Sequence, residues 1–475
     1  MLTRVEIDGF KTFRDFALDL PPFLVVLGRN GAGKSNLFDA LRFLSRLAAE
    51  PVLEAAQHAR GDLVELFHRE ADGRPAGRSM RFAVEVLLSG PVTDPFGETR
   101  QAGAARVRYE LTIELRDSPV GLRPFVTHES AHALIAAEDS WRRRFPDVAA
   151  RLLDGREERV TRFLDTEQKP GSPRFHVFAD PPGSPDAPRQ PDMLIPAANA
   201  TATVLSVIRT AGESSTLFAL RRELESWQQL HLEPAALRRP DSFDDPSSLG
   251  QDGSHLPNTL HRIAQTTRDT ERPDGLLGDI SADLAGIISD VSGVQLDEDA
   301  KRRRREVEFR ARGRGDAVSA RVASDGTLRA AALLTAAYDP SNSGLLCFEE
   351  PENGIYPQRL ITLVQRLRSI VERAIDRRAD DPAAPLMQLL LTSHSPAILG
   401  ALDPAGFHGV RADVVFMSSV SRILPGRSRT KVTQPRLIAA EPRTSQVDSD
   451  GLDSNVRLVS PAEIAEFEVR QALEA

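Results

Sequence analysis

The sequence has 475 residues, enough for two or three domains, and its 41% hydrophobic and 27% charged residues are typical of a soluble globular protein. The formal net charge of −8 excludes a protein that is basic as a whole, so any contact with nucleic acid must come from a local patch. The single cysteine, Cys347, excludes an internal disulfide framework and fits a reducing cytoplasm. No apolar run reaches the roughly 18 residues that a membrane span needs, and the first residues indicate a strand and not a secretory signal. We therefore expect a cytoplasmic protein without membrane contact.

The chain begins with strands that lead into a glycine-rich loop. Residues 1–20 alternate in polarity and predict two antiparallel strands before the apolar run 23–27. Residues 28–35, GRNGAGKS, then fit the pattern G-x-x-x-x-G-K-[ST], and leucines recur at helical spacing over 37–47. A strand, a glycine loop and a helix in this order predict a phosphate-binding loop.

The residue types in this loop suit phosphate binding. Gly28, Gly31 and Gly33 allow backbone N–H groups to turn inward around the phosphates, and the helix N-terminus adds partial positive charge. Lys34 would then reach the β- and γ-phosphates, and the Ser35 hydroxyl would ligate Mg²⁺. The alternative is a chance glycine turn before an amphipathic helix, which the full pattern in its full context disfavours.

The middle of the chain changes its periodicity twice. From about residue 80 to 117 apolar residues alternate with period two, which predicts a β-meander or hairpin. Apolar residues fall at helical spacing in Ser130–Arg151 and in Thr203–Gln229, so we expect a mainly helical insertion over 121–275. The Pro- and Gly-rich interval Lys169–Pro191 is predicted to be an exposed loop.

A basic run follows the insertion. Lys301–Arg305 precedes two alternating stretches joined by a turn at 313–316, which predicts a hairpin with a basic flank. Charge runs usually face water, so we interpret this basic run as the solvent-exposed end of a strand. The alternative is that it contacts DNA.

Three later stretches bear on the chemistry. Ser324 and Gly326 stand before an apolar helix over 328–338, where a hydroxyl, free N–H groups and the helix dipole form an anion site. Taken alone, this stretch would be an ordinary N-cap.

Two apolar strands end in groups that can carry charge. Residues 344–348 run into Glu349 and Glu350, and buried strands seldom end in adjacent carboxylates without a cation. Glu349 would hold the Mg²⁺ shell and Glu350 would polarise the attacking water. Residues 389–391 lead to His394, which could sense the γ-phosphate, although a lone histidine is usually structural.

Together these stretches resemble the Walker A, signature, Walker B and His-switch motifs of ABC-type ATPases. The likeness is closest to the RecF/SMC/OLD-like branch, often called AAA family ATPases (AAA_21-like). The flanking GFKTF at 9–13 and DGSHLP at 252–257 are also similar to that branch. The likeness covers residues 1–50 and 275–400 and is weak over 120–275 and in the tail.

The resemblance implies an α/β fold, an ABC-type P-loop ATPase head built from a mixed β-sheet with flanking helices and an antiparallel β subdomain, with a mainly helical insertion. It divides the chain into head segments 1–120 and 276–425, an insertion over 121–275 and a tail over 426–475. ATP and Mg²⁺ would be the cofactors, and two heads would sandwich two ATPs, with Ser324 of one subunit completing the site of the other. The residues implied are Lys34, Glu350 and His394 for catalysis; Gly28, Asn30, Gly31, Gly33, Lys34, Ser35, Asn36, Ser324 and Gly326 for the nucleotide; and Ser35 and Glu349 for the metal.

The sequence departs from the family pattern at three points. Glu349 stands where the family more often has Asp, and Tyr356 stands where related sequences often carry His. A Q-loop glutamine cannot be placed, and Gln57 and Gln101 are only candidates. The missing coiled coil argues against a long-armed SMC-like tether.

Several functions fit these motifs. We expect a nucleotide-gated switch for a separate effector or nuclease subunit, or for DNA bound without sequence preference, in the anti-phage defence of a bacterium; a RecF-like DNA repair ATPase is the alternative. An OLD-type nuclease is a further alternative, but Asp448 and Asp450 lie in the polar stretch 444–453 and not behind an apolar strand. A scaffold that binds nucleotide without hydrolysis is disfavoured because both carboxylates accompany the loop and the histidine.

Overall fold

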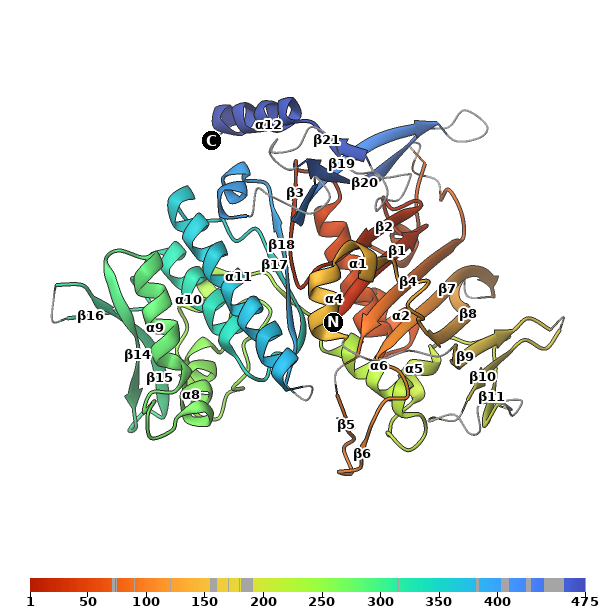
Figure 1. The fold of residues 1–475 in the computed structure, drawn as a ribbon, viewed down its shortest axis with the longest axis horizontal. Helices are drawn as coiled ribbons and strands as arrows, with labels where there is room; N and C mark the ends of the chain where they lie inside the picture. The colour runs from red at the N-terminus through yellow and green to blue at the C-terminus, as the bar shows by residue number, and fades with distance from the viewer. Residues whose placement is uncertain are drawn as a thin grey trace.

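Three β-sheets and the helices between them make up most of the fold (Figure 1). The computed structural model describes residues 1–475 except 71–72, 74, 89, 120, 154–159, 170, 179, 181–190, 314–315, 382–383, 403–409, 424–428, 440–456 and 475. A mixed seven-stranded sheet lies at the centre, an eight-stranded antiparallel sheet lies to one side, and a four-stranded sheet with its helices lies to the other. This arrangement confirms the predicted α/β fold with a mixed sheet and an antiparallel subdomain.

The central sheet brings distant parts of the sequence to one edge. Its order is β12 (Gln228–Leu230), β17 (Gly344–Glu349), β18 (Met387–Ser393), β3 (Phe23–Gly28), β19 (Val410–Ile423), β20 (Arg429–Ala439) and β21 (Arg457–Val459). The first five strands run parallel, and β20 pairs antiparallel with β19. Parallel strands end at the same edge, so the residues that follow β12, β17, β18 and β3 meet there.

Side-chain alternation lets this sheet divide the hydrophobic core in two. Successive residues of a strand point to opposite faces. On β3, Leu24 and Val26 belong to one buried cluster, and Phe23, Val25 and Leu27 belong to the other. Strands covered on both faces read as continuous apolar runs, which is why the sequence shows 23–27 without polar alternation.

The first cluster joins the central sheet to the antiparallel sheet. That sheet has the order β11 (Met193–Pro196), β10 (Arg174–Val177), β9 (Arg162–Glu167), β8 (Gly121–Ala133), β7 (Arg106–Ser118), β4 (Ser79–Leu87), β1 (Leu2–Asp8) and β2 (Phe16–Asp19). The strands expected in 1–20 and 80–117 are therefore β1, β2, β4 and β7. A small separate hairpin consists of β5 (Val92–Thr93) and β6 (Thr99–Arg100).

Helices pack on the central sheet and on the sheets to either side of it. They are α1 (Lys34–Leu47), α2 (Val52–Gln57), η1 (Leu63–Leu66), α3 (Ser140–Arg144), α4 (Pro146–Leu152), α5 (Val204–Val207), α6 (Ser215–Glu225), α7 (Pro234–Leu237), α8 (Leu256–Thr267), α9 (Leu276–Ile287), α10 (Asp325–Tyr338), α11 (Pro357–Asp380), η2 (Pro396–Ala401) and α12 (Pro461–Glu474). The four-stranded sheet contains β13 (Asp241–Ser242), β14 (Val291–Asp299), β15 (Arg304–Ala311) and β16 (Ala317–Ser319). Among the described residues, no helix has the length and apolar character needed to cross a membrane.

The region 121–275 is not one helical unit, which corrects the prediction. Residues 121–133 form β8, whose partner is β7, and β9 to β11 extend the same sheet. Within this region helices begin only at Ser140, and α6 and α8 occupy its later part. Residues 131–133 suit either state, and pairing of β8 with β7 selects the strand there.

The C-terminal region contributes to the central sheet. β20 and β21 continue the sheet beyond residue 425, where the head was expected to end. Asp448 and Asp450 lie outside the described residues, as does the whole of the expected loop 444–453. Part of the expected loop Lys169–Pro191 is also outside them.

Candidate functional site

The glycine-rich loop joins β3 to α1 at the carboxyl edge of the central sheet. Gly28 ends β3, and Gly33 caps α1 with a φ of 98°, a conformation that favours glycine. A Cβ atom on Gly33 would also overlap the Thr433 side chain of β20. Arg29, Asn30 and Gly31 are exposed at the mouth of the loop. Asn36 lies inside α1, where its amide donates to Thr12 Oγ1 at 2.8 Å.

Lys34 is held within its own loop. Its Nζ donates to the carbonyl oxygens of Gly28 (2.5 Å) and Arg29 (3.2 Å), and the residue is only 6% exposed. Burial lowers the pKa of Lys34, and the nearby carboxylates of Glu350, Glu352 and Glu349 oppose this shift. The lysine therefore belongs to a cluster in which one cation lies among three acidic side chains.

Ser35 and Glu349 bring the phosphate loop and β17 together. Ser35 Oγ donates to Glu349 Oε1 at 2.5 Å. The second carboxylate oxygen, Oε2, lies 3.3 Å from Nδ1 of His231, the residue after β12. A hydroxyl and a carboxylate are oxygen donors of the kind that Mg²⁺ prefers, so this pair fits the metal that the motifs imply.

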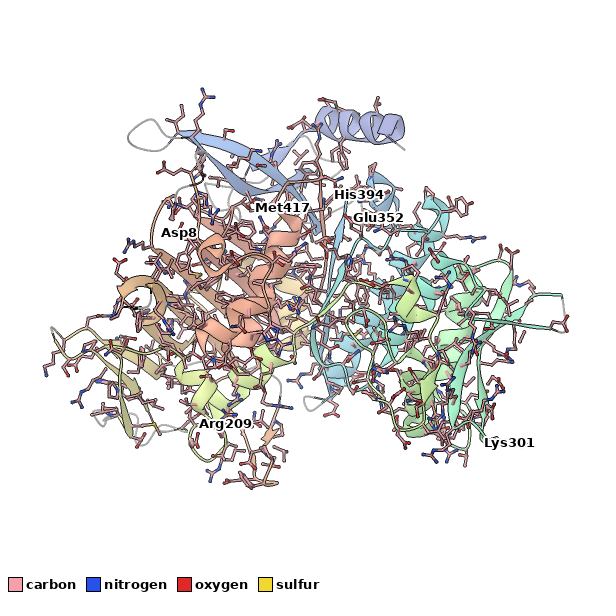
Figure 2. All side chains as sticks on the ribbon, turned by 180° about the vertical axis from the view of Figure 1, so that it is seen from behind. Asp8, Arg209, Lys301, Glu352, His394 and Met417 are labelled. Carbon is pink, nitrogen blue, oxygen red and sulfur yellow. The ribbon has the colours of Figure 1, made fainter. Side chains whose placement is uncertain are left out.

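Glu350 and His394 follow neighbouring strands and face one another. Glu350 has a φ of 48°, which is uncommon for a residue other than glycine, and its Oε2 accepts from Asn353 Nδ2 at 3.0 Å. His394 Nδ1 lies 3.6 Å from Glu350 Oε1 and 3.0 Å from Glu352 Oε1. Figure 2 shows Glu352 and His394 together at this edge of the sheet.

The serine and glycine of the expected signature lie at the start of α10. Ser324 is the N-cap, and its Oγ accepts from the Thr327 N–H at 3.2 Å. Gly326 packs so closely on Gly354 that a Cβ atom would overlap the Gly354 carbonyl oxygen. Within the described part of the chain, no hydrogen bond or ion pair joins Ser324 or Gly326 to residues 28–36.

The signature residues border an open pocket of about 920 Å³. Apolar side chains stand exposed beside it: Val322 is 77% exposed and Tyr356 is 72% exposed. Exposed apolar groups at the rim of a pocket are typical of an interaction surface.

A comparison with protein families identifies the family to which the chain belongs. The family model described as "AAA domain, putative AbiEii toxin, Type IV TA system" matches residues 23–400. The chain belongs to this AAA family. Its members are P-loop proteins, typically ATPases, and membership implies nucleotide binding.

Curated relatives of this AAA chain match only in part. Chromosome partition protein Smc of Thauera aminoaromatica is 31% identical over 180 residues, which cover 34% of this chain and 14% of that protein. Smc of Bordetella petrii is 27% identical over 172 residues, with the same coverage of 34% and 14%. The chain thus spans a small fraction of the length of these relatives.

Solved structures of Smc heads also match. An Smc head bound to the C-terminal winged-helix domain of ScpA has 12% sequence identity and a TM-score of 0.45, and the match covers 91% of this chain and 97% of that one. The SMC head domain from Thermotoga maritima has 10% identity and a TM-score of 0.35, with coverage of 91% and 98%. The fold assignment of this AAA protein rests on its sheet order and its family match.

The structure brings residues to the site that the sequence did not single out. His231, Glu352 and Thr433 contact Glu349, His394 and the phosphate loop, respectively. No periodicity marks His231, because β12 is only three residues long and lies in a region read as helical. Glu352 was visible only as the third acidic residue of the EEPEN stretch. The Q-loop candidates do not join them: Gln57 is exposed at the end of α2, and the Gln101 carbonyl accepts from Ser215 beside α6.

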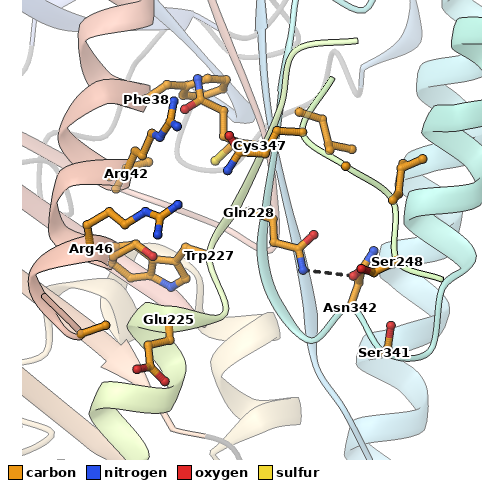
Figure 3. Close-up of a pocket in the computed structure, with 18 residues that line it drawn as sticks. Phe38, Arg42, Arg46, Glu225, Trp227, Gln228, Ser248, Ser341, Asn342 and Cys347 are labelled. Atoms are coloured by element: carbon orange, nitrogen blue, oxygen red, sulfur yellow. Dashed lines mark hydrogen bonds between the residues drawn. The ribbon is translucent and has the colours of Figure 1, made fainter. Parts of the chain in front are cut away.

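A second pocket, of about 430 Å³, borders α1 but contains none of the predicted site residues (Figure 3). Arg42 and Arg46 reach into it from α1, and Trp227 and Gln228 line it from the start of β12. Gln228 donates to Asn342 across the pocket at 3.2 Å.

The basic run is largely neutralised by acidic neighbours. Arg303 bonds Asp244 at 2.8 Å, and Arg305 bonds Glu298 at 2.7 Å. The Arg305 guanidinium also lies 4.2 Å from the centre of the Phe243 ring. Lys301 lies at the far end of the β14–β15 hairpin, away from His394 (Figure 2).

Proposed function

We propose that this protein binds ATP with Mg²⁺ and hydrolyses it, and that its nucleotide state switches a dimer that acts on a partner. The contact between Ser35 Oγ and Glu349 Oε1 supports this function most directly. It joins the phosphate loop to a strand end more than 300 residues later in the sequence. Two carboxylates and a histidine at that edge form the kind of site that phosphoryl transfer to water requires.

Each residue has a distinct role in this proposal. Lys34 leaves the carbonyl oxygens of its loop and binds the β- and γ-phosphates, while Ser35 and Glu349 hold Mg²⁺, which neutralises phosphate charge when bound. Glu350 accepts a proton from the attacking water. His394, beside Glu350, contacts the γ-phosphate.

The dimer is proposed from the place of Ser324. It lies at the start of a 14-residue helix, and among the described residues no hydrogen bond or ion pair joins it to the phosphate loop of its own chain. A second copy could place its nucleotide against this helix end, where free N–H groups and the dipole favour an anion. The exposed Val322 and Tyr356 would then be covered in the dimer.

Anti-phage defence with a separate effector is the proposed process. The family description refers to the AbiEii toxin and a type IV toxin–antitoxin system, which favours defence over the RecF-like repair alternative.

Glu350→Gln tests the hydrolysis. The amide cannot accept the proton from water, so turnover should fall on the order of 10²–10⁴-fold while ATP binding persists. Lys34→Ala should weaken binding and turnover together because it removes a phosphate ligand. Steady-state hydrolysis and equilibrium binding of a fluorescent ATP analogue separate the two effects. Full turnover by Glu350→Gln would place the general base elsewhere.

A further inference from the structure

Glu352 connects the ends of two parallel strands. Its Oε1 accepts from the backbone N–H of His394 and from the Ser393 hydroxyl, each at 2.8 Å. Ser393 is the last residue of β18 and is fully buried, whereas Glu352 lies three residues beyond the end of β17. One carboxylate oxygen therefore fixes the main chain at the position where His394 leaves its strand.

The imidazole ring of His394 lies against the same carboxylate. Nδ1 is 3.0 Å from Glu352 Oε1 and 3.6 Å from Glu350 Oε1, so Glu352 is the nearer carboxylate. Nδ1 is buried and forms no hydrogen bond with any described residue. Glu352 Oε2 is also buried without a partner, and the Glu352 side chain is only 8% exposed. The carboxylate and the imidazole thus each keep one buried atom without a hydrogen bond, and a hydrogen bond between the two side chains would remove part of the desolvation cost.

Pairing with Glu352 also determines which ring nitrogen is free. When one nitrogen of a neutral imidazole donates to a carboxylate, the other nitrogen is the acceptor, and the ring orientation is fixed. Among the described residues, none forms a hydrogen bond or ion pair with Nε2 of His394. Nε2 is therefore available for a ligand.

We propose that Glu352 is a positioning residue that holds His394, through Nδ1, in the orientation needed to contact the γ-phosphate with Nε2. The inference rests on the proposed nucleotide function and adds a residue to it. Glu352 itself does not touch the nucleotide. Its charge also lies near Lys34, so the residue is close enough to the phosphate loop for this role.

A double-mutant cycle tests the inference without requiring turnover. The quantity measured is the ratio of the dissociation constants for ADP and for a non-hydrolysable ATP analogue, which reports contact with the γ-phosphate. His394→Ala and Glu352→Gln should each reduce this ratio on the order of 10-fold, the lower end of what removing the orienting partner of a metal-bound histidine costs. The double variant should lose no more than either single variant, because Glu352 acts through His394.

The controls separate positioning from folding. Glu308→Gln removes a partly buried carboxylate that accepts from Gln295 on the distant hairpin, and it should leave the ratio unchanged. If Glu352 were only a structural link, Glu352→Gln would weaken ADP and analogue binding equally, and the two substitutions would add; either result would overturn the inference. An unchanged ratio in His394→Ala would overturn it as well. Absence of hydrolysis in the wild-type protein, with the expected ratios, would count against the proposed ATPase activity but support the positioning role.

Discussion

Lys34 presents its ammonium group to two carbonyl oxygens of its own loop, those of Gly28 and Arg29. These oxygens and the three nearby glutamates keep a buried cation solvated by the protein. A nucleotide phosphate would replace the carbonyl oxygens as the partner of Lys34. The ammonium group therefore already lies within the phosphate loop.

A second buried group, far from the nucleotide site, should make stability depend on pH. Glu129 on β8 is fully buried and accepts from the Tyr109 hydroxyl at 2.9 Å and the Val204 N–H at 2.6 Å. Burial raises its pKa from 4.5 to about 7. Between these values the folded state keeps a proton that the unfolded chain releases, so stability falls as pH rises.

We therefore expect the Glu129 contribution to be complete below about pH 4.5 and lost as pH rises through about 7, with a total change of about 3 kcal/mol. Glu129→Gln should flatten this dependence, because glutamine does not titrate. Urea unfolding at pH 5 and pH 8 measures the difference. Glu114→Gln, at a partly exposed position of the same sheet, should retain the wild-type slope; a slope unchanged in Glu129→Gln would contradict the assignment.

At the scale of elements, the β14–β15 hairpin bears on DNA binding. Asp244 and Glu298 neutralise Arg303 and Arg305, which supports the solvated strand end over a DNA contact. We expect charge reversal of Arg303 and Arg304 to leave the affinity for duplex DNA unchanged. Fluorescence anisotropy over a range of salt concentrations is the measurement, because phosphate contacts would appear as a steep salt dependence. A tenfold loss of affinity in the variant would restore the DNA interpretation.

At the scale of the whole molecule, the proposed dimer predicts complementation between inactive subunits. Ser324→Arg blocks the helix end that meets the partner's nucleotide, and Lys34→Ala damages the phosphate loop. A mixed dimer retains one composite site with an intact loop and an intact Ser324, so mixing the two proteins should restore part of the ATPase activity. Sedimentation with ATP, using Glu350→Gln to prevent turnover, should show dimers. Activity no higher than that of the parent variants would rule out completion in trans.

The molecule is also expected to act through another protein. We predict that the purified chain hydrolyses ATP but leaves plasmid DNA and RNA intact with Mg²⁺ or Mn²⁺, and that a second polypeptide co-purifies from the native cell in an ATP-dependent way. Gel assays and affinity purification test the two parts. Nuclease activity abolished by Asp448→Ala or Asp450→Ala, but not by Lys34→Ala, would revive the OLD-type alternative.

The sequence predicted the parts of the fold that local patterns encode. The run 23–27, the glycine loop and the following leucines predicted β3, its loop and α1, because strand, turn and helix each follow from neighbouring residues. The apolar runs before Glu349 and His394 predicted β17 and β18 for the same reason. The prediction of a mainly helical 121–275 was wrong for β8 to β11, because each of these strands depends on pairing with a neighbouring strand and not on its own apolar spacing.

What the sequence alone determined is the set of chemical groups: a phosphate loop, two adjacent carboxylates, a histidine and a serine at a helix start. Only the tertiary structure decided which other side chains accompany them. His231 lies beside Glu349 because β12 is parallel to β17, and Thr433 reaches the loop because β20 extends the same sheet. Contacts between residues hundreds of positions apart depend on the order and register of strands, which hydrogen bonding across the whole sheet fixes and no local pattern records.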